Sequence, residues 1–306
     1  MNKKLYCIVI SAILVIFINS KIYSQEFTSK FGKIDDKEFK MTVYEKDTSA
    51  VAVILADCGN SYFQVNDNED NFQVVFDRYV RIKILKKEGF KWANIEIPMI
   101  FESNKRERIT GFKAETSNLV NGKVVKTKSD YNPVFDKKVD GINENIVFTM
   151  QEIKVGSIIE YKYTIISDFF FKFRNWQFQY EIPVVKSEYF SLIPQQMVYE
   201  ITMQGNQPFT MKESYIREED FGFKFKTVPY YGGVIYSGKC YYHSKSNFKH
   251  YEAKDLPAIT NEPYMSPCKN FLLTLNFELK FLDFIPSIFS QVYGKTYTTL
   301  DKKTSL

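Results

Sequence analysis

Alternation of apolar and polar side chains with a period of two is the feature that most constrains the fold of this chain. It is clearest from Leu273 to Phe281, where every second residue is Leu or Phe and the residues between are polar. Ser157–Ile166 alternates in the same way and is rich in β-branched and aromatic residues. Because successive side chains of a strand point to opposite faces of a sheet, both runs predict half-buried strands. Similar runs recur at short intervals without helical blocks. We therefore expect an all-β fold, an antiparallel β-sandwich built from many short strands with little helix.

The stretch from Gly156 to Pro194 holds the densest aromatic cluster of the chain. We expect two strands in it, Ser157–Ile166 and Phe171–Ile182, joined as a hairpin by the short link between them. Trp176 stands in the apolar face of the second run. Large rings dominate burial energetics, so we interpret this face as core; an aromatic ligand platform is the alternative.

Two other segments carry strong local signals. Val74–Leu85 alternates, which predicts a strand with a buried face around Ile82 and a solvent-exposed face around Arg81. Asn121-Gly122 lies between strand-like runs and predicts a tight hairpin turn, because both turn positions need a positive φ.

Two polar segments predict breaks between strands. Asp57-Cys58-Gly59-Asn60 follows the apolar run Val51–Leu55 and indicates a turn. Glu102–Arg108 is rich in charge, and we expect it to be a solvated loop.

Residues 1–24 have the parts of a secretory signal peptide. Lys3 and Lys4 precede an apolar run from Cys7 to Ile18, and Ser24 supplies a small residue at the cleavage point. We therefore expect an exported protein, in the periplasm or at the cell surface, with no membrane span after cleavage. An uncleaved membrane anchor is the alternative, although the apolar run is short for a spanning helix.

The rest of the chain divides into three parts: a mobile lead-in at 25–40, a β-rich domain at 41–282 and a divergent tail at 283–306. The β-rich part is one domain or two packed β subdomains, since a chain of 306 residues allows either. Loss of residues 1–24 removes three lysines and no acid, so the formal charge falls from +5 to +2. A nearly balanced chain gives no support for nucleic-acid binding, and we expect none.

Three cysteines remain after signal cleavage: Cys58, Cys240 and Cys268. An odd number in an exported chain allows at most one disulfide, and the sequence leaves its pairing open. With no disulfide framework, the hydrophobic core must hold the fold together.

Few residues are suited to catalysis or metal binding. A cysteine nucleophile needs a histidine base, and the only histidines are His243 and His250. Cys240 and His243 have a spacing compatible with a metal, but a zinc site needs three or four protein ligands. We therefore expect no catalytic residue, no metal site and no cofactor.

A tyrosine-rich stretch with interleaved glycines is the one candidate ligand surface. It would offer flat rings on which a sugar or peptide could stack; the alternative is a set of strand and turn residues at a domain seam, which we favour. Its members are Tyr230, Tyr231, Tyr236, Tyr241 and Tyr242.

Six segments together resemble a known family, the β-rich domain of unknown function that precedes a transglutaminase-like core in envelope proteins of the Bacteroidetes type. The resemblance covers roughly residues 40 to 280. It rests on YEKDTSAVAVILADCG (44–59), RYVRIKILKKEGFKWANIEIP (78–98), GFKAETSNLVNGKVVKTK (111–128), VGSIIEYKYTI (155–165), NWQFQYEIPVVKSEYFSLIP (175–194) and LPAITNEPYM (256–265).

The resemblance implies a papain-like core with Cys, His and Asp in that order, beginning near residue 300. The sequence departs from the family pattern after Phe281, and no cysteine follows Cys268 in the 306 residues. No family active-site residue can therefore be carried over to this chain.

These observations lead to one main hypothesis and two alternatives. The main hypothesis is a non-catalytic, exported β-sandwich module that accompanies a transglutaminase-like domain, or binds an envelope protein or a glycan. The alternatives are a truncated fragment of a transglutaminase-like enzyme precursor and a carbohydrate-binding module.

Overall fold

The computed structural model of the chain describes residues 27–66, 71–102, 104–130, 134–138, 143–227, 236–259 and 270–283. Strands dominate these residues, which confirms the all-β prediction; the helical segments among them are the short helix α2 (Asp36–Lys40) and the 3₁₀ helix η1 (Lys87–Ala93). The strands are β1 (Ala52–Val65), β2 (Phe72–Ile84), β3 (Asn94–Glu102), β4 (Lys105–Arg106), β5 (Arg108–Val120), β6 (Lys123–Ser129), β7 (Val134–Lys138), β8 (Asn143–Thr149), β9 (Ile158–Ser167), β10 (Trp176–Gln177), β11 (Val184–Pro194), β12 (Met197–Gln204), β13 (Met211–Thr227), β14 (Tyr236–Leu256) and β15 (Thr274–Leu282).

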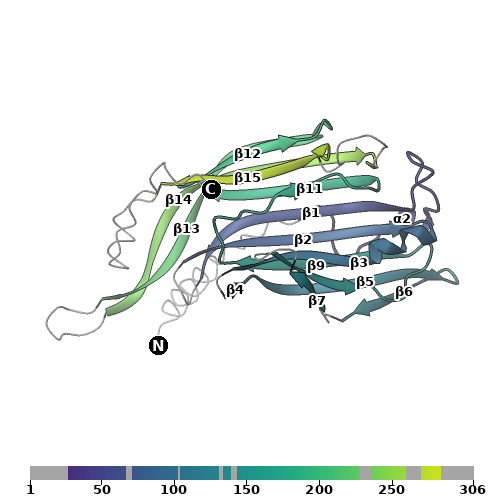
Figure 1. Cartoon of the computed structure of the whole chain (residues 1–306), viewed down its shortest axis with the longest axis horizontal. Coiled ribbons are helices and arrows are strands. Elements are labelled where there is room, and N and C mark those ends of the chain that lie inside the picture. Colours follow the sequence, from purple (N-terminus) through teal and green to yellow (C-terminus); the bar gives the residue numbers. More distant parts are fainter. Residues whose placement is uncertain are drawn as a thin grey trace, which may run out of the picture.

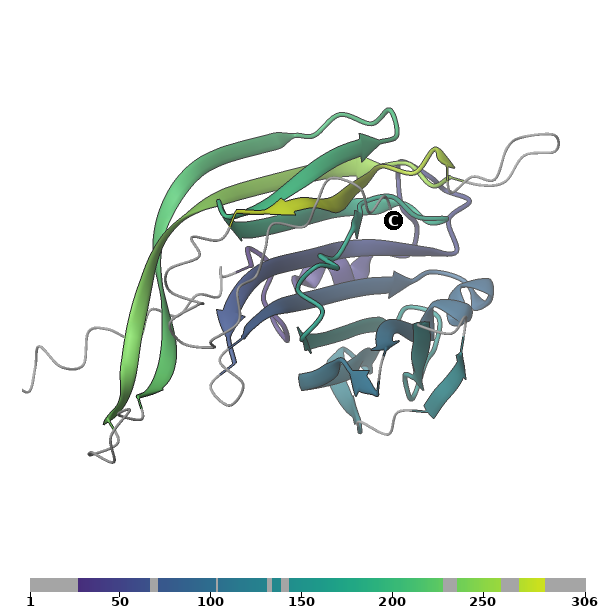
Figure 2. The same ribbon diagram turned by 60° about the vertical axis from the view of Figure 1, so that its left-hand side comes forward.

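An eight-stranded sheet forms the frame, in the order β13-β14-β11-β1-β2-β9-β5-β6. Neighbouring strands are antiparallel except β1 and β11, which are parallel and place Gly59 opposite Tyr189. Several strands are longer than we expected: β13 has 17 residues and β14 has 21. These two strands pair along the whole of β13, and together they extend away from the rest of the sheet as a long, curved ribbon (Figures 1 and 2).

Two smaller sheets, β10-β15-β12 and β4-β3-β8-β7, share one hydrophobic core with the large sheet. In the sheet β10-β15-β12, Phe277 of β15 packs against Tyr189 of β11, with ring centroids 5.8 Å apart. In the sheet β4-β3-β8-β7, Phe148 of β8 lies 6.0 Å from Tyr161 of β9. The fold is thus a sandwich in which one large sheet faces two small ones (Figure 1).

Residues 27–40, which we expected to be a mobile lead-in, lie against the other face of the large sheet; we call them the N-terminal strap. Phe27 stacks on Phe190, and Phe31 meets Tyr79 edge-on, with centroids 6.5 and 6.4 Å apart. The strap is fixed at its backbone as well, because the N–H of Gly32 donates to the carboxylate of Glu160 at 3.1 Å.

The strap also buries the face of β2 that we expected to be wet. Tyr79, Arg81 and Lys83 are only 1%, 5% and 0% exposed. The strap accepts from two of them, because Arg81 donates to the carbonyl of Lys33 at 2.6 Å and Lys83 donates to the carbonyl of Phe39 at 3.0 Å. The hydroxyl of Tyr79 donates to Glu160 of β9 at 2.6 Å. The polar residues of this face therefore bind buried carbonyl and carboxylate groups rather than water.

The predicted hairpin between Ser157–Ile166 and Phe171–Ile182 is wrong in its second half. The first run forms β9, but β9 pairs with β2 and β5. In the second run only Trp176–Gln177 is a strand, and it pairs with β15. The rest crosses the core, where its large rings fill space between sheets, so the interpretation of Trp176 as core is confirmed.

Other local predictions had mixed outcomes. Asn121 and Gly122 have φ of 51° and 75° and join β5 to β6, as the Asn-Gly signal predicted. The run from Leu273 to Phe281 forms β15, with its first half buried and Phe281 exposed. The predicted turn at Asp57–Asn60 is wrong, because these residues lie in the middle of β1.

The predicted signal peptide (1–24) lies outside the described residues, as does the tail except Asp283. In the described part of the chain, no helix combines the length and the apolar character that crossing a bilayer requires.

Candidate functional site

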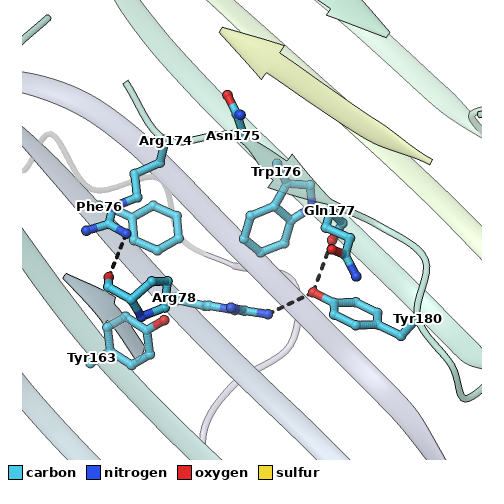
Figure 3. Close-up of a pocket in the computed structure, with 9 residues that line it drawn as sticks. Phe76, Arg78, Tyr163, Arg174, Asn175, Trp176, Gln177 and Tyr180 are labelled. Carbon is cyan, nitrogen blue, oxygen red and sulfur yellow. Dashed lines mark hydrogen bonds between the residues drawn. The ribbon is translucent and has the colours of Figure 1, made fainter. Parts of the chain in front are cut away.

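A pocket of about 170 Å³ opens where the segment before β10 crosses the large sheet (Figure 3). Its walls combine two arginines and several aromatic rings, and its rim carries amide side chains and a proline. The lining residues are Phe76, Arg78, Pro98, Tyr163, Arg174, Asn175, Trp176, Gln177 and Tyr180.

One side of the pocket is a triangle of Asp57, Arg78 and Tyr180. The guanidinium of Arg78 donates to both carboxylate oxygens of Asp57, from Nε at 3.0 Å and from Nη2 at 2.9 Å. Nη2 also donates to the Tyr180 hydroxyl at 2.8 Å, and that hydroxyl donates to Asp57 at 2.6 Å. Burial raises the pKa of Tyr180 well above its ordinary value, and burial would lower the pKa of Arg78 but Asp57 raises it. The triangle is therefore a charged guanidinium that is paired with Asp57 and capped by a neutral phenol.

The other side is an ion pair between Arg174 and Glu107. Nη2 of Arg174 donates to Oε2 of Glu107, and Nη1 donates to the carbonyl of Pro98 at 2.9 Å. The N–H of Ile100 donates to the same carboxylate oxygen at 2.8 Å. Within the described part of the chain, two buried atoms of this pair have no hydrogen-bond partner: Nε of Arg174 and Oε1 of Glu107. The prediction of a solvated loop at Glu102–Arg108 is right in part: Asn104, Lys105 and Arg106 are exposed, but Glu107 is 3% exposed and pairs with Arg174.

Each of the two guanidiniums lies over an aromatic ring. Arg78 lies over Trp176 at 5.3 Å, and Arg174 lies over Phe76 at 5.6 Å. Trp176 in turn stacks on Tyr189 of β11 in the large sheet, with centroids 5.0 Å apart. Cation–π contacts of this kind hold a planar cation in one orientation, which gives the pocket a fixed shape.

Gly59 makes room for this arrangement. The indole of Trp176 lies directly over it, and a Cβ at this position would be 2.3 Å from Cζ3 of the ring. The combination Asp57-Cys58-Gly59-Asn60, which indicated a turn, is therefore a strand segment that supplies an anion and a space for Trp176.

The cysteines and histidines singled out by sequence do not meet at this pocket. Cys58 is fully buried, and burial raises the pKa of its thiol well above the ordinary value. His250 is stacked on Phe190 at 4.1 Å, and burial lowers its pKa. β11 lies between their strands, and His250 is two residues along β14 from the position opposite Cys58, so their backbones are about 12 Å apart. Burial makes Cys58 inert and keeps His250 neutral.

The other members of that set lie elsewhere. His243 is exposed on β14 and contacts Asp220 through Nδ1 at 2.7 Å. Cys240 is in β14, and Cys268 lies outside the described residues. In the part of the chain that the structure describes, no cluster of three or more potential metal ligands occurs.

The tyrosine-rich candidate surface is only partly described. Tyr230 and Tyr231 lie outside the described residues, and Tyr236 begins β14. Tyr241 is 70% exposed, whereas Tyr242 is half-buried against the core. As neighbours in one strand, Tyr241 and Tyr242 point to opposite faces and do not share a stacking surface.

Sequence reasoning missed the pocket residues, although a signal was present. Asp57 is the one charged residue of β1, and Arg174 interrupts an aromatic run; Arg78 is harder to single out, because it is one of four charged residues in β2. A lone charge in such a setting needs a buried partner of opposite sign, and here each has one.

The fold and the site define an all-β domain with a pocket in which each arginine is paired with a buried carboxylate. A family profile for a domain of unknown function with solved structure, DUF3857, matches residues 70–224. This is half of the chain, and the chain belongs to this family. The expected kinship to a β-rich domain of unknown function is confirmed to that extent.

Comparison with other proteins adds the fold alone. No curated protein matches the sequence. A solved structure of a "putative protease" from Parabacteroides distasonis is similar, with a TM-score of 0.50 and 13% identity. The match covers 76% of this chain and 41% of that chain, so this chain spans about two fifths of the length of that protein.

Proposed function

We propose that this chain is a non-catalytic, exported β-domain that serves as an accessory or interaction module for a hydrolase-type catalytic core. In this proposal the core is transglutaminase-like, as the sequence resemblance implies, and the module acts in the periplasm or at the cell surface. Its partners are that core, another envelope protein or a glycan.

The observation that carries the proposal is the way the pocket handles its charges. Each pocket arginine is paired with a buried carboxylate, Arg78 with Asp57 and Arg174 with Glu107. Catalytic acids and bases need a pKa near the working pH, whereas burial moves the pKa of the Tyr180 phenol upwards. Such a site is suited to holding a group by shape and hydrogen bonds rather than to moving protons.

The comparisons support the accessory role. The Parabacteroides distasonis protein carries more than half of its chain outside the match. Its description as a protease therefore belongs to a larger protein than the part that resembles this chain. A domain of that kind folds beside a second unit, which is what an accessory module does.

Enzyme assays on the chain from residue 25 test the proposal. We expect no hydrolysis of peptide substrates and no glutamine–lysine crosslinking above the level without protein. Alanine variants of Cys58, Cys240 and Cys268, made one at a time, identify the source of any turnover. Thiol-dependent turnover that one of these variants abolishes would refute the non-catalytic assignment.

A further inference from the structure

The arginine pocket has room for one group of side-chain size. Its volume of about 170 Å³ is below the range of roughly 300–1,000 Å³ that holds a whole small molecule. Asn175 and Pro98 lie exposed at its rim, so such a group would enter from a larger molecule outside.

The charged side chains that line the pocket are both positive. Arg78 and Arg174 belong to the lining, and their side chains are 20% and 15% exposed. Their partners Asp57 and Glu107 are 0% exposed and do not belong to it. A group in the pocket therefore contacts the guanidiniums and not the carboxylates. Because Coulomb energy falls with distance, the nearer positive charges favour an anion there and disfavour a cation.

Two hydrogen-bond donors of the lining are free to bind a group in the pocket. Nε and Nη2 of Arg78 donate to Asp57 and Tyr180, but Nη1 makes no hydrogen bond to any described residue. The hydroxyl of Tyr163 makes none to the described residues either. Both atoms are open to solvent, in contrast to Nε of Arg174, which is buried without a partner.

The strand register brings these two donors to one face of the large sheet. Arg78 of β2 lies directly opposite Tyr163 of β9, and both side chains line the pocket (Figure 3). Cβ atoms of such a pair are about 4.5–5.5 Å apart, so one small group is within reach of both side chains. A guanidinium has donors and no acceptor, so the group must bring the acceptor. A carboxylate brings two, and its hydrogen bonds to arginine are charge-assisted and therefore stronger than neutral ones.

The narrowness of the pocket favours a carboxylate on a flexible stem. In an aspartate or glutamate side chain, one or two methylenes separate the carboxylate from the backbone and can lie between the rings of Phe76 and Trp176. In an acidic sugar the carboxylate is attached directly to the ring, which would have to enter behind it. A polypeptide therefore suits the pocket better than a glycan.

We propose that the Arg78–Tyr163 pair binds the carboxylate of an acidic side chain that a partner polypeptide inserts into the pocket. One carboxylate oxygen accepts from Nη1 of Arg78 and the other accepts from the Tyr163 hydroxyl, while Arg174 adds its positive charge. This inference rests on the proposed interaction role and names the group through which a partner is held. Turnover in the enzyme assays would refute that role and leave the ligand of the pocket in place, so the two proposals fail separately.

Titrations of the chain from residue 25 at constant ionic strength test the inference. The probes are the N-acetylated, C-amidated derivatives of glutamate, glutamine and lysine, with glucuronate as the acidic sugar. The readout is the indole N–H signal of Trp176, which lines the pocket; the signal of Trp92, which does not, is the internal control. We expect the glutamate derivative to shift the Trp176 signal saturably, with Kd on the order of 10 mM. The other probes should bind at least about tenfold more weakly, because each lacks the charge or the stem.

Tyr163→Phe removes the proposed hydroxyl and keeps the ring. Its matched control is Tyr161→Phe, since Tyr161 stacks on Tyr163 in the same strand but does not line the pocket. We expect Tyr163→Phe to weaken binding of the glutamate derivative by about tenfold and Tyr161→Phe to leave it unchanged.

Several results would overturn the inference. Equal binding of the glutamine derivative would show that charge is not recognised, and tighter binding of the lysine derivative would make the pocket a cation site. Equal binding of glucuronate would refute the assignment to a polypeptide, and equal effects of the two tyrosine variants would refute the role of Tyr163. No saturable shift of the Trp176 signal would leave the pocket without this ligand. The order of the four probes on the unmodified chain decides the question even if Tyr163→Phe does not fold.

Discussion

Replacement of Gly59 by alanine brings a new methyl group into the centre of the aromatic stack. Its Cβ would lie 2.3 Å from Cζ3 of Trp176 and 2.7 Å from two further ring atoms. Carbon atoms in contact stay about 3.5–4.0 Å apart, so the indole must move by more than about 1 Å. It has little room to do so, because it is 2% exposed and stacks on Tyr189.

The magnitude follows from what the indole loses. Overpacking in a dense core costs about 1–3 kcal/mol. The displaced ring also loses the hydrogen bond from its Nε1 to Ser187, now 3.2 Å long, which is worth about 1 kcal/mol. We therefore expect Gly59→Ala to lower the free energy of unfolding by about 2–4 kcal/mol, a large share of the total stability of a domain.

Urea unfolding of the chain from residue 25 measures this loss, with tryptophan fluorescence as the signal. Gly222→Ala is the matched control: its Cβ would meet the ring of Tyr241 at 3.2 Å, but that side chain is 70% exposed and can turn aside. We expect the control to change stability by less than about 0.5 kcal/mol.

A double variant separates the steric clash from other effects. Trp176→Ala removes the ring that Gly59→Ala would strike, so the second change should cost little on that background. The reasoning is refuted if Gly59→Ala alone behaves like Gly222→Ala, or if its cost is unchanged when residue 176 is alanine.

Three further predictions concern the strap and the sheet. Phe31 is half-buried, so Phe31→Ala should weaken the docking of the strap by about 1–2 kcal/mol, seen as earlier tryptic cleavage within residues 27–40. Val43→Ala is the control, because Val43 is 48% exposed and its loss should not speed cleavage. Equal cleavage of the two variants would argue against Phe31 as an anchor of the strap. Burial lowers the pKa of Lys83 from 10.5 to about 8, so between these values the unfolded chain holds the extra proton and stability rises with pH. The unfolding free energy of the wild type minus that of Lys83→Met should therefore rise by about 1.5 kcal/mol from pH 8 to about pH 9.5. A difference that does not change with pH in urea titrations would contradict this. Gly122→Ala should cost about 1 kcal/mol despite open space around it, because φ is +75°; an unchanged urea midpoint would contradict the strain argument.

The sequence predicts strands well where one face packs and the other meets water. β15 is of this kind and alternates as expected. β9 was also predicted from its alternation, although the strap covers Glu160 on its polar face. The Asn-Gly turn was also predictable, because its requirement for positive φ is local. In these elements the local pattern and the tertiary setting agree.

Prediction failed where polar groups are buried against other polar groups. The face of β2 around Arg81 has the composition of a solvent-exposed face, but the strap covers it, and the strap and Glu160 of β9 together pair with Arg81. Asp57 and Gly59 have the composition of a turn, but the first pairs with Arg78 and the second lies beneath Trp176. A pattern along one strand contains no information about a partner from a distant segment, so neither the pocket nor the strap was accessible from the sequence.

The parallel pairing of β1 with β11 has a consequence for how the molecule folds. The centre of the large sheet cannot form until β11 is present, since Cys58 of β1 pairs with Glu188 of β11, which comes much later in the sequence. The strap, which precedes β1 in the sequence, contacts β2, β9 and β11, so its contacts cannot all form before β11 is in place. Folding that waits for distant segments is slow, because loop closure precedes any gain from contact. A chain with this topology therefore stays open until its later strands are available.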